Sequence, residues 1–217
     1  NQAFANCPSI TEIELPSTVK KLDAFSFGSC KSLRSVKLND GLTAIGSIAF
    51  KNCTSLTTIT IPKSVTSFNN DAFAGCSSLE TVYYYTSLNV QPEDVTATVV
   101  GISENSTGVS VDKVKFNSGV TAYVIPSVID GKTVTAVGND VFNGNNTLTS
   151  VTIPNAVTAI GDNAFSECTK LKTVKLPKNL ETIGNNSFGN CWELAEIELP
   201  EGLKSIGSDA FFNCSSL

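Results

Sequence analysis

One pattern of apolar and polar positions recurs along the chain every 23 residues. Each repeat carries a phenylalanine, and an aliphatic residue follows it six positions later. The phenylalanines are Phe4, Phe27, Phe50, Phe73, Phe142, Phe165, Phe188 and Phe211. A cysteine lies three residues after each of them, except that Asn145 follows Phe142. A fixed period of this length is typical of a solenoid, in which successive coils stack on one another.

Each repeat contains a short segment in which apolar and polar residues alternate, as in Leu56 to Pro62. Alternation with period two predicts a strand with one buried face and one solvent-exposed face. A proline usually follows and ends the strand, because proline has no backbone N–H to donate. The next segment, for example residues 64–68, places apolar residues three apart. A glycine is then expected to permit a tight bend, and these glycines are Gly46, Gly161, Gly184 and Gly207.

The segment around each phenylalanine and cysteine is too short for a stable helix, so we expect one turn of 3-10 or α structure there. Each repeat is therefore expected to form one coil with a strand, a bend, a second extended piece and a helical turn. A lone coil cannot bury its apolar edge. Stacked coils bury it, and their strands form a long parallel sheet with a spacing of roughly 4.8 Å. The phenylalanine and leucine positions then become ladders in the core.

The consensus L-x-x-I-x-I-P-x-x-V-x-x-I-G-x-x-A-F-x-x-C resembles the BspA-type leucine-rich repeat, a 23-residue class of many bacterial surface proteins. The resemblance implies a curved solenoid of the α/β type with a parallel sheet on its concave face. It also implies export to the cell surface, where some members act as adhesins for host or bacterial proteins. A fold does not name a ligand, because unrelated functions share folds.

The repeat divides the chain into three parts. Residues 1–85 hold a first leucine-rich repeat array of about four coils, the first of them incomplete, and residues 120–217 hold a second array with a truncated last coil. The repeat disappears in residues 86–119, where a valine-rich alternation predicts a β-rich island that joins the arrays. A disordered linker is the alternative, and the frequent valine and low charge of this segment speak against it.

Two tight turns are predicted in the middle of the chain. The first is Asn105 to Gly108, which would join strands at residues 94–103 and 109–116 in a hairpin. The repeat pattern returns at Val120 to Pro126, and the pair Asp130-Gly131 beyond it indicates the second turn.

Composition agrees with an exported module that binds no nucleic acid. The 217 residues are 41% apolar with a mean hydropathy of +0.09, which suits a continuous core. A net charge of −5 lacks the basic stripe expected of nucleic-acid binding. No apolar run reaches the roughly 18 residues that span a bilayer, so we expect no membrane insertion. We expect a monomeric fragment of a longer secreted or cell-surface protein, with its signal and anchor outside the sequence.

The seven cysteines follow the repeat, so they point the same way from successive coils. Parallel Cα–Cβ bonds give poor disulfide geometry, and we interpret these residues as buried free thiols. Asn145 at the same repeat position indicates that this position takes a small group able to bond a neighbouring backbone amide or carbonyl. Because the chain has no histidine and no Cys-x-x-Cys pair, neither a metal site nor a cofactor is expected.

Catalysis is not expected either. The absence of histidine excludes Ser-His and Cys-His activation of a nucleophile within this chain. The carboxylate pairs Glu12/Glu14 and Glu196/Glu198 each share one face of a strand. A glycosidase needs two carboxyl groups that face each other across a cleft, which one open sheet does not offer. We interpret these pairs as solvated outward positions.

The outward strand positions form a candidate binding surface of two adjacent columns. The first column is Glu12, Ser35, Thr58, Thr81, Ser150, Thr173 and Glu196. The second column is Glu14, Lys37, Thr60, Tyr83, Thr152, Lys175 and Glu198. Tyrosine is enriched in binding hot spots, and the candidate protein-binding residues are Tyr83, Tyr85, Tyr123, Lys37, Lys175, Thr60 and Thr152. Alternatively, the tyrosines cover the junction between the arrays.

Two functions remain open. One is a non-enzymatic protein-binding or adhesion module for extracellular or host proteins, which uses the outward face of the sheet. The other is a structural spacer that projects other domains of a longer surface protein and has no ligand of its own. Clustered aromatic or charged side chains on one face would favour binding, and a uniformly small, polar face would favour the spacer.

Overall fold

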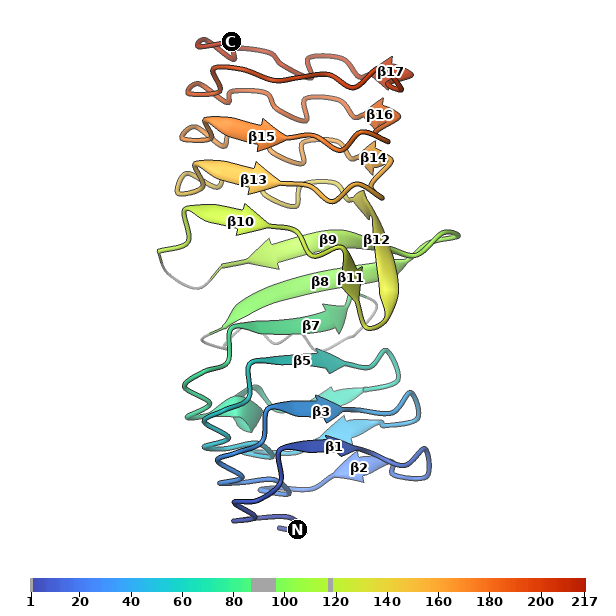
Figure 1. Ribbon diagram of the computed structural model, residues 1–217, viewed down its shortest axis with the longest axis vertical. Coiled ribbons are helices and arrows are strands. Elements are labelled where there is room, and N and C mark those ends of the chain that lie inside the picture. Colours follow the sequence, from blue (N-terminus) through green and yellow to red (C-terminus); the bar gives the residue numbers. More distant parts are fainter. Residues whose placement is uncertain (1, 87–96, 117–118) are drawn as a thin grey trace. The chain divides into compact units, whose positions relative to one another are not determined.

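The computed structural model describes residues 2–86, 97–116 and 119–217 (Figure 1). The described residues form short strands linked by turns, with the 3-10 helix η1 (Asn70–Phe73) as their only helix. Strands of neighbouring coils pair in parallel, so the predicted repeat solenoid is confirmed.

Contacts divide the chain into two compact units. The first unit comprises residues 1–101 and 115–117, and the second comprises residues 102–114 and 118–217. These two units are defined by contacts between residues, whereas the three parts predicted from the sequence were defined by where the repeat is present. The predicted boundaries of the two arrays and the island therefore stay a prediction.

In the first unit the strands occupy two rows. They are β1 (Glu12–Glu14), β2 (Lys21–Leu22), β3 (Ser35–Lys37), β4 (Ala44–Ile45), β5 (Thr58–Ile61), β6 (Ser67–Phe68) and β7 (Thr81–Tyr85). One row contains the pairs β1–β3 and β5–β7, and the other is the three-stranded sheet β2-β4-β6. Paired residues are 23 apart, as Glu14 and Lys37 are, so the sheet register repeats the sequence period.

The second unit also has two rows of strands. One row is the sheet of β10 (Ala122–Val124), β13 (Ser150–Thr152) and β15 (Thr173–Lys175). The other row contains β9 (Val109–Lys115), β12 (Lys132–Val137), β14 (Ala159–Ile160), β16 (Thr182–Ile183) and β17 (Ser205–Ile206). The short strand β11 (Val128–Ile129) pairs with β12 in the antiparallel direction.

Both predicted turns in the middle of the chain are confirmed. Strands β8 (Thr98–Glu104) and β9 are sheet neighbours around a turn in which the Asn105 N–H donates to the Gly108 carbonyl at 3.0 Å. The first three residues of the predicted strand 94–103 lie outside the described residues. The second turn has positive φ at Asp130 (52°) and Gly131 (72°), as a two-residue hairpin turn requires.

The predicted phenylalanine ladder forms in both units. Successive rings of Phe4, Phe27, Phe50 and Phe73 stack at centroid distances of 5.1, 5.4 and 5.5 Å. Successive rings of Phe142, Phe165, Phe188 and Phe211 stack at 4.9, 5.0 and 5.3 Å. Interplanar angles are at most 15°, so the rings lie nearly parallel up each stack.

The expected helical turn beside each phenylalanine forms in one coil, at η1, and is wrong for the other described coils. In those coils the residues two before and two after the phenylalanine have positive φ, as Asn163 (53°) and Glu167 (59°) have around Phe165. A left-handed residue cannot continue a right-handed helix, so the chain makes single turns instead. The Phe165 N–H then donates across coils to the Ser187 carbonyl at 2.7 Å. Each coil consequently consists of short β-strands and turns, with almost no helix.

The repeated glycines serve the stacking of coils rather than the predicted bend. None of Gly161, Gly184 and Gly207 has a positive φ. A Cβ atom on Gly184 would lie 2.6 Å from the backbone nitrogen of Asp162 and from the carbonyl carbon of Gly161 in the preceding coil. Only glycine allows the two backbones to approach so closely.

All seven cysteines are free thiols. From the second coil onward, each thiol donates to the carbonyl of the phenylalanine 26 residues earlier, as Cys191 Sγ does to Phe165 O at 3.1 Å. This contact confirms that the position takes a small group that bonds a neighbouring backbone. Asn145 instead accepts the N–H groups of Thr147 and Leu148 at 3.0 Å. Burial raises the pKa of the Cys168 thiol to about 12.

Candidate binding groove

The outward side chains of the second unit form two columns, as predicted. Strand pairing places Ser150 opposite Thr173 and Thr152 opposite Lys175, and Thr173 bridges to Glu196 on the next coil. Extending this register by two residues from the Thr173–Glu196 bridge places Glu198 beside Lys175. Strands β13 and β15 lie side by side in Figure 1.

A groove of about 910 Å³ lies over these columns. Its polar lining includes Ser150, Thr152, Thr173, Lys175, Glu196 and Glu198. The two threonines and the serine provide small side chains, and the lysine and the glutamates are exposed. The groove therefore combines small hydroxyl groups with charges of both signs.

The charges of this groove are not neutralised by the part of the chain that the structure describes. Lys175, Lys178, Glu196 and Glu198 form no ion pair with any residue in the described ranges. In the first unit, by contrast, Lys37 Nζ lies 2.7 Å from Glu14 Oε1. The lysine and glutamates of the groove are thus available to a charged ligand.

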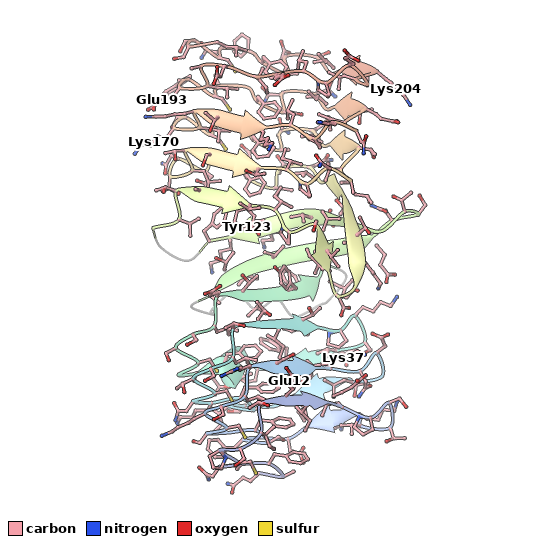
Figure 2. All side chains as sticks on the ribbon, viewed as in Figure 1. Glu12, Lys37, Tyr123, Lys170, Glu193 and Lys204 are labelled. Atoms are coloured by element: carbon pink, nitrogen blue, oxygen red, sulfur yellow. The ribbon has the colours of Figure 1, made fainter. Side chains whose placement is uncertain are left out.

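Of the predicted binding residues, Thr152 and Lys175 line the groove. Thr60 and Tyr83 lie opposite each other on β5 and β7, in the first unit, and both are half-buried. Burial raises the pKa of the Tyr83 hydroxyl above its ordinary value. Lys37 lies at the carboxyl end of β3 (Figure 2), where it pairs with Glu14. The predicted residues are therefore divided between the two units.

Two predicted binding residues do not lie on an exposed face. Tyr85 is only 4% exposed, and Tyr84 before it is also buried. The alternation of buried and exposed side chains along β7 therefore ends at these two residues. Alternation holds only where one face of a strand stays open to solvent. Tyr123 pairs in register with the buried Val151, and its ring lies 6.1 Å from that of Phe142, toward the core. The alignment of residues 120–126 with residues 56–62 already contained this signal, because it places Tyr123 at an inward position.

Glu196 and Glu198 were predicted to be solvated outward positions and were not named among the candidate protein-binding residues. Their place beside Lys175 follows from the repeat period. The lack of an intramolecular partner depends on side-chain conformation, which no sequence pattern reports.

A second, shallower depression of about 370 Å³ lies over β14, β16 and β17. Its side chains Asn139, Asp162 and Asn185 already have partners. Asn139 Oδ1 accepts the Asp162 N–H at 2.9 Å, and Asp162 Oδ1 accepts the Asn185 N–H at 2.6 Å. Asn185 Oδ1 continues this ladder to the Ser208 N–H at 2.8 Å. This depression is therefore explained by coil stacking.

Other kinds of site find no support in the described part of the chain. Those residues contain no group of three or more side chains of His, Cys, Asp or Glu placed to hold a metal ion. Among the same residues, no helix has the length and apolar character needed to cross a bilayer.

Several solved structures resemble the chain. A leucine-rich cell surface protein from Faecalibacterium prausnitzii is 26% identical with a TM-score of 0.48, and the match covers 100% of this chain and 61% of that one. The pneumococcal vaccine antigen PcpA is 24% identical with a TM-score of 0.42, over 90% of this chain and 46% of that one. A leucine-rich repeat protein from Bacteroides capillosus is 28% identical with a TM-score of 0.42, over 48% of this chain and 86% of that one. The chain thus spans less than two thirds of the first two proteins.

No curated protein matches the chain at a significant level. The family model of the BspA type leucine-rich repeat region matches residues 1–118 and 121–217 in six copies. This match covers almost the whole sequence and agrees with the stacked parallel strands. The chain therefore belongs to the BspA-type leucine-rich repeat family.

Proposed function

We propose that the chain is a non-enzymatic protein-binding module of a bacterial cell-surface protein, and that it binds extracellular proteins through the groove of its second unit. One observation carries the proposal. Lys175, Glu196 and Glu198 present charges that form no ion pair with any described residue, around a floor of small hydroxyl side chains. Complementary charges on a partner increase association rate and specificity.

Cell-surface placement is part of the proposal. The family and the name of the Faecalibacterium protein, a leucine-rich cell surface protein, support it. We expect the chain to be monomeric in solution, with its partner a different protein. Leucine-rich repeat folds typically bind rather than catalyse, which supports a role without chemistry.

A spacer role is the second candidate, and the first unit favours it. Its outward face carries small polar residues such as Ser35, Thr58 and Thr60. The charged residues Lys37 and Glu14 on that face neutralise each other. Glu12 is the remaining charged residue of these columns, so this face offers less to a charged ligand than the groove does and suits a segment that only supports its neighbours.

Two matched arginine substitutions test the proposal. Thr152→Arg places a long side chain in the groove, and Thr60→Arg makes the same change at the equivalent position of the first unit. Both threonines are half-buried members of the same outward column. Binding of purified extracellular-matrix and serum proteins to the immobilised chain is measured by surface plasmon resonance, with circular dichroism to confirm folding.

We expect saturable binding of at least one of these proteins to the parent chain and to Thr60→Arg. Binding to Thr152→Arg should fall at least tenfold. Equal binding to both variants would exclude the groove as the binding site. A folded parent chain that binds none of the proteins saturably would favour the spacer.

A further inference from the structure

The outward face of the second unit changes chemical character from one coil to the next. On β10 the outward residues are apolar, and Val124 is 67% exposed. Val124 lies opposite Thr152 on β13, and Thr152 lies opposite Lys175 on β15. Glu198 follows on the next coil. The order across four coils is therefore apolar, neutral polar, cationic and anionic.

The charged members of this series, Lys175 and Glu198, can bind groups of opposite charge. Lys175 and Glu198 occupy neighbouring coils, as Glu14 and Lys37 do in the first unit, yet neither forms an ion pair within residues 2–86, 97–116 and 119–217. Lys178 and Glu196 lie in the same groove and add one further charge of each sign. A ligand that brings an anion to the lysines and a cation to the glutamates gains charge-assisted contacts without breaking an existing pair.

The spacing of the coils matches the spacing of an extended peptide. Neighbouring strands lie roughly 4.8 Å apart, so Val124 and Glu198, three steps apart, are separated by about 14 Å. An extended chain advances roughly 3.4 Å per residue, so its residues i and i+4 are also about 14 Å apart and point to the same side. Residue i+2 then falls at about 7 Å, between Thr152 and Lys175, within reach of the flexible lysine side chain.

We propose that the groove, together with Val124 on the adjacent strand β10, binds an extended peptide segment in which an apolar, an acidic and a basic residue occupy positions i, i+2 and i+4. This inference rests on the proposed function and specifies the class of partner. The apolar residue packs on Val124, the acidic residue contacts Lys175 and Lys178, and the basic residue contacts Glu196 and Glu198. The segment lies across the strands and adds no strand to the sheet.

Fluorescent peptides test the proposal by anisotropy. The probes are Gly-Leu-Ser-Asp-Ser-Lys-Gly, the same residues in reverse chain direction, and the charge-exchanged Gly-Leu-Ser-Lys-Ser-Asp-Gly. All three have the same composition and net charge, so only the order of residues differs. We expect one chain direction of the first sequence to bind the parent chain at least fivefold more tightly than the charge-exchanged peptide.

Charge exchange in the protein provides the matched control. The double variant Lys175→Glu/Glu198→Lys should bring the affinity ratio of the two peptides to one or below. The double variant Glu14→Lys/Lys37→Glu, on the first unit, should leave the ratio unchanged. Equal affinities for all three peptides, no binding up to millimolar concentration, or a ratio that survives the Lys175/Glu198 exchange would each overturn the proposal.

The outcome separates this inference from the proposed function. Protein binding that Thr152→Arg abolishes, together with no preference among the peptides, would reject the peptide inference and keep the groove as the binding site. A peptide preference that depends on Lys175 and Glu198, together with protein binding that Thr152→Arg leaves intact, would place the protein-binding site elsewhere.

Discussion

The outward faces of the two units derive from the same positions of one repeat but differ in how their charges are used. In the first unit, Lys37 and Glu14 form an ion pair at 2.7 Å. In the second unit, Lys175 and Glu198 occupy corresponding neighbouring positions without pairing among the described residues. The repeat thus determines where an outward side chain stands, whereas binding capacity depends on which charges remain available there.

The inward faces, in contrast, are nearly the same in both units. Each has a stack of phenylalanine rings and thiols that donate to phenylalanine carbonyls. This contrast separates the residues that hold the coils together from those that distinguish one coil from another. Changes to the inward face should therefore affect both units alike, and changes to the outward face should not.

The largest effect is expected at the phenylalanine ladder. Phe27 and Phe165 are both 0% exposed, so Phe27→Ala and Phe165→Ala should each cost about 3–5 kcal/mol of unfolding free energy. Urea unfolding followed by circular dichroism measures both. A loss confined to one of the two variants would contradict the equivalence of the inward faces.

A smaller loss is expected at the stacked glycines. Gly184→Ala forces a methyl group against the backbone of the preceding coil and should cost about 1–3 kcal/mol. Gly131→Ala is the control, because no heavy atom lies within 4 Å there and only its positive φ of 72° resists a side chain. Gly131→Ala should lower the free energy of unfolding by about 1 kcal/mol. Thermal unfolding of both variants checks the order, and a Gly184→Ala as stable as the parent would refute the stacking role.

The buried thiols predict a loss of stability at alkaline pH. Burial raises the pKa of Cys168 to about 12, while the unfolded thiol ionises near 9.0. A raised pKa means that the folded state favours the neutral thiol, so the stabilisation is complete below pH 9 and is lost as pH rises toward 12. At pH 10 the loss from this thiol should be about 1.4 kcal/mol relative to pH 8.

The variant Cys168→Ser isolates this contribution, because a hydroxyl donates a hydrogen bond but does not titrate in this range. Urea unfolding at pH 8 and pH 10 should show a smaller decrease for Cys168→Ser than for the parent. An identical decrease in the two proteins would mean that this thiol is not protected by burial.

The smallest effects are expected on the outward faces themselves. Lys37→Ala removes an exposed ion pair and should cost less than about 1 kcal/mol, with the difference reduced at high salt. Lys175→Ala removes no ion pair with a described residue and should leave stability unchanged. Urea unfolding at low and high salt distinguishes the two. A salt-sensitive loss at Lys175 comparable to that at Lys37 would show that the two faces do not differ as described.

Much of the fold follows from the sequence because each position of the repeat occurs several times, so that its buried or exposed character can be compared between coils. The strand register, the ring ladder around Phe165 and the hydrogen-bonding role of the cysteine position were all predictable. The single turns were not predictable from sequence. They require positive φ at residues such as Phe25 and Ile48, whose large or β-branched side chains do not favour that conformation. Contacts between coils override the local preference at those positions.

The candidate site was predictable only in part. Thr152 and Lys175 line the groove because alternation places them outward. Tyr85 was misplaced because alternation fails where both strand faces are covered, and Tyr123 because its aromatic character outweighed its inward register position. Whether Lys175 has a partner depends on side-chain geometry, which is why the groove became evident only in three dimensions.

The role of the groove is tested by locating a bound protein on the chain. A matrix or serum protein that binds saturably is titrated into the ¹⁵N-labelled chain, and the perturbed backbone amides are mapped by NMR. We expect these amides to cluster at residues 150–152, 173–175 and 196–198. Perturbations confined to β3 and β5 of the first unit, or to the turn around the exposed Trp192, would contradict the claim that the groove is the binding site.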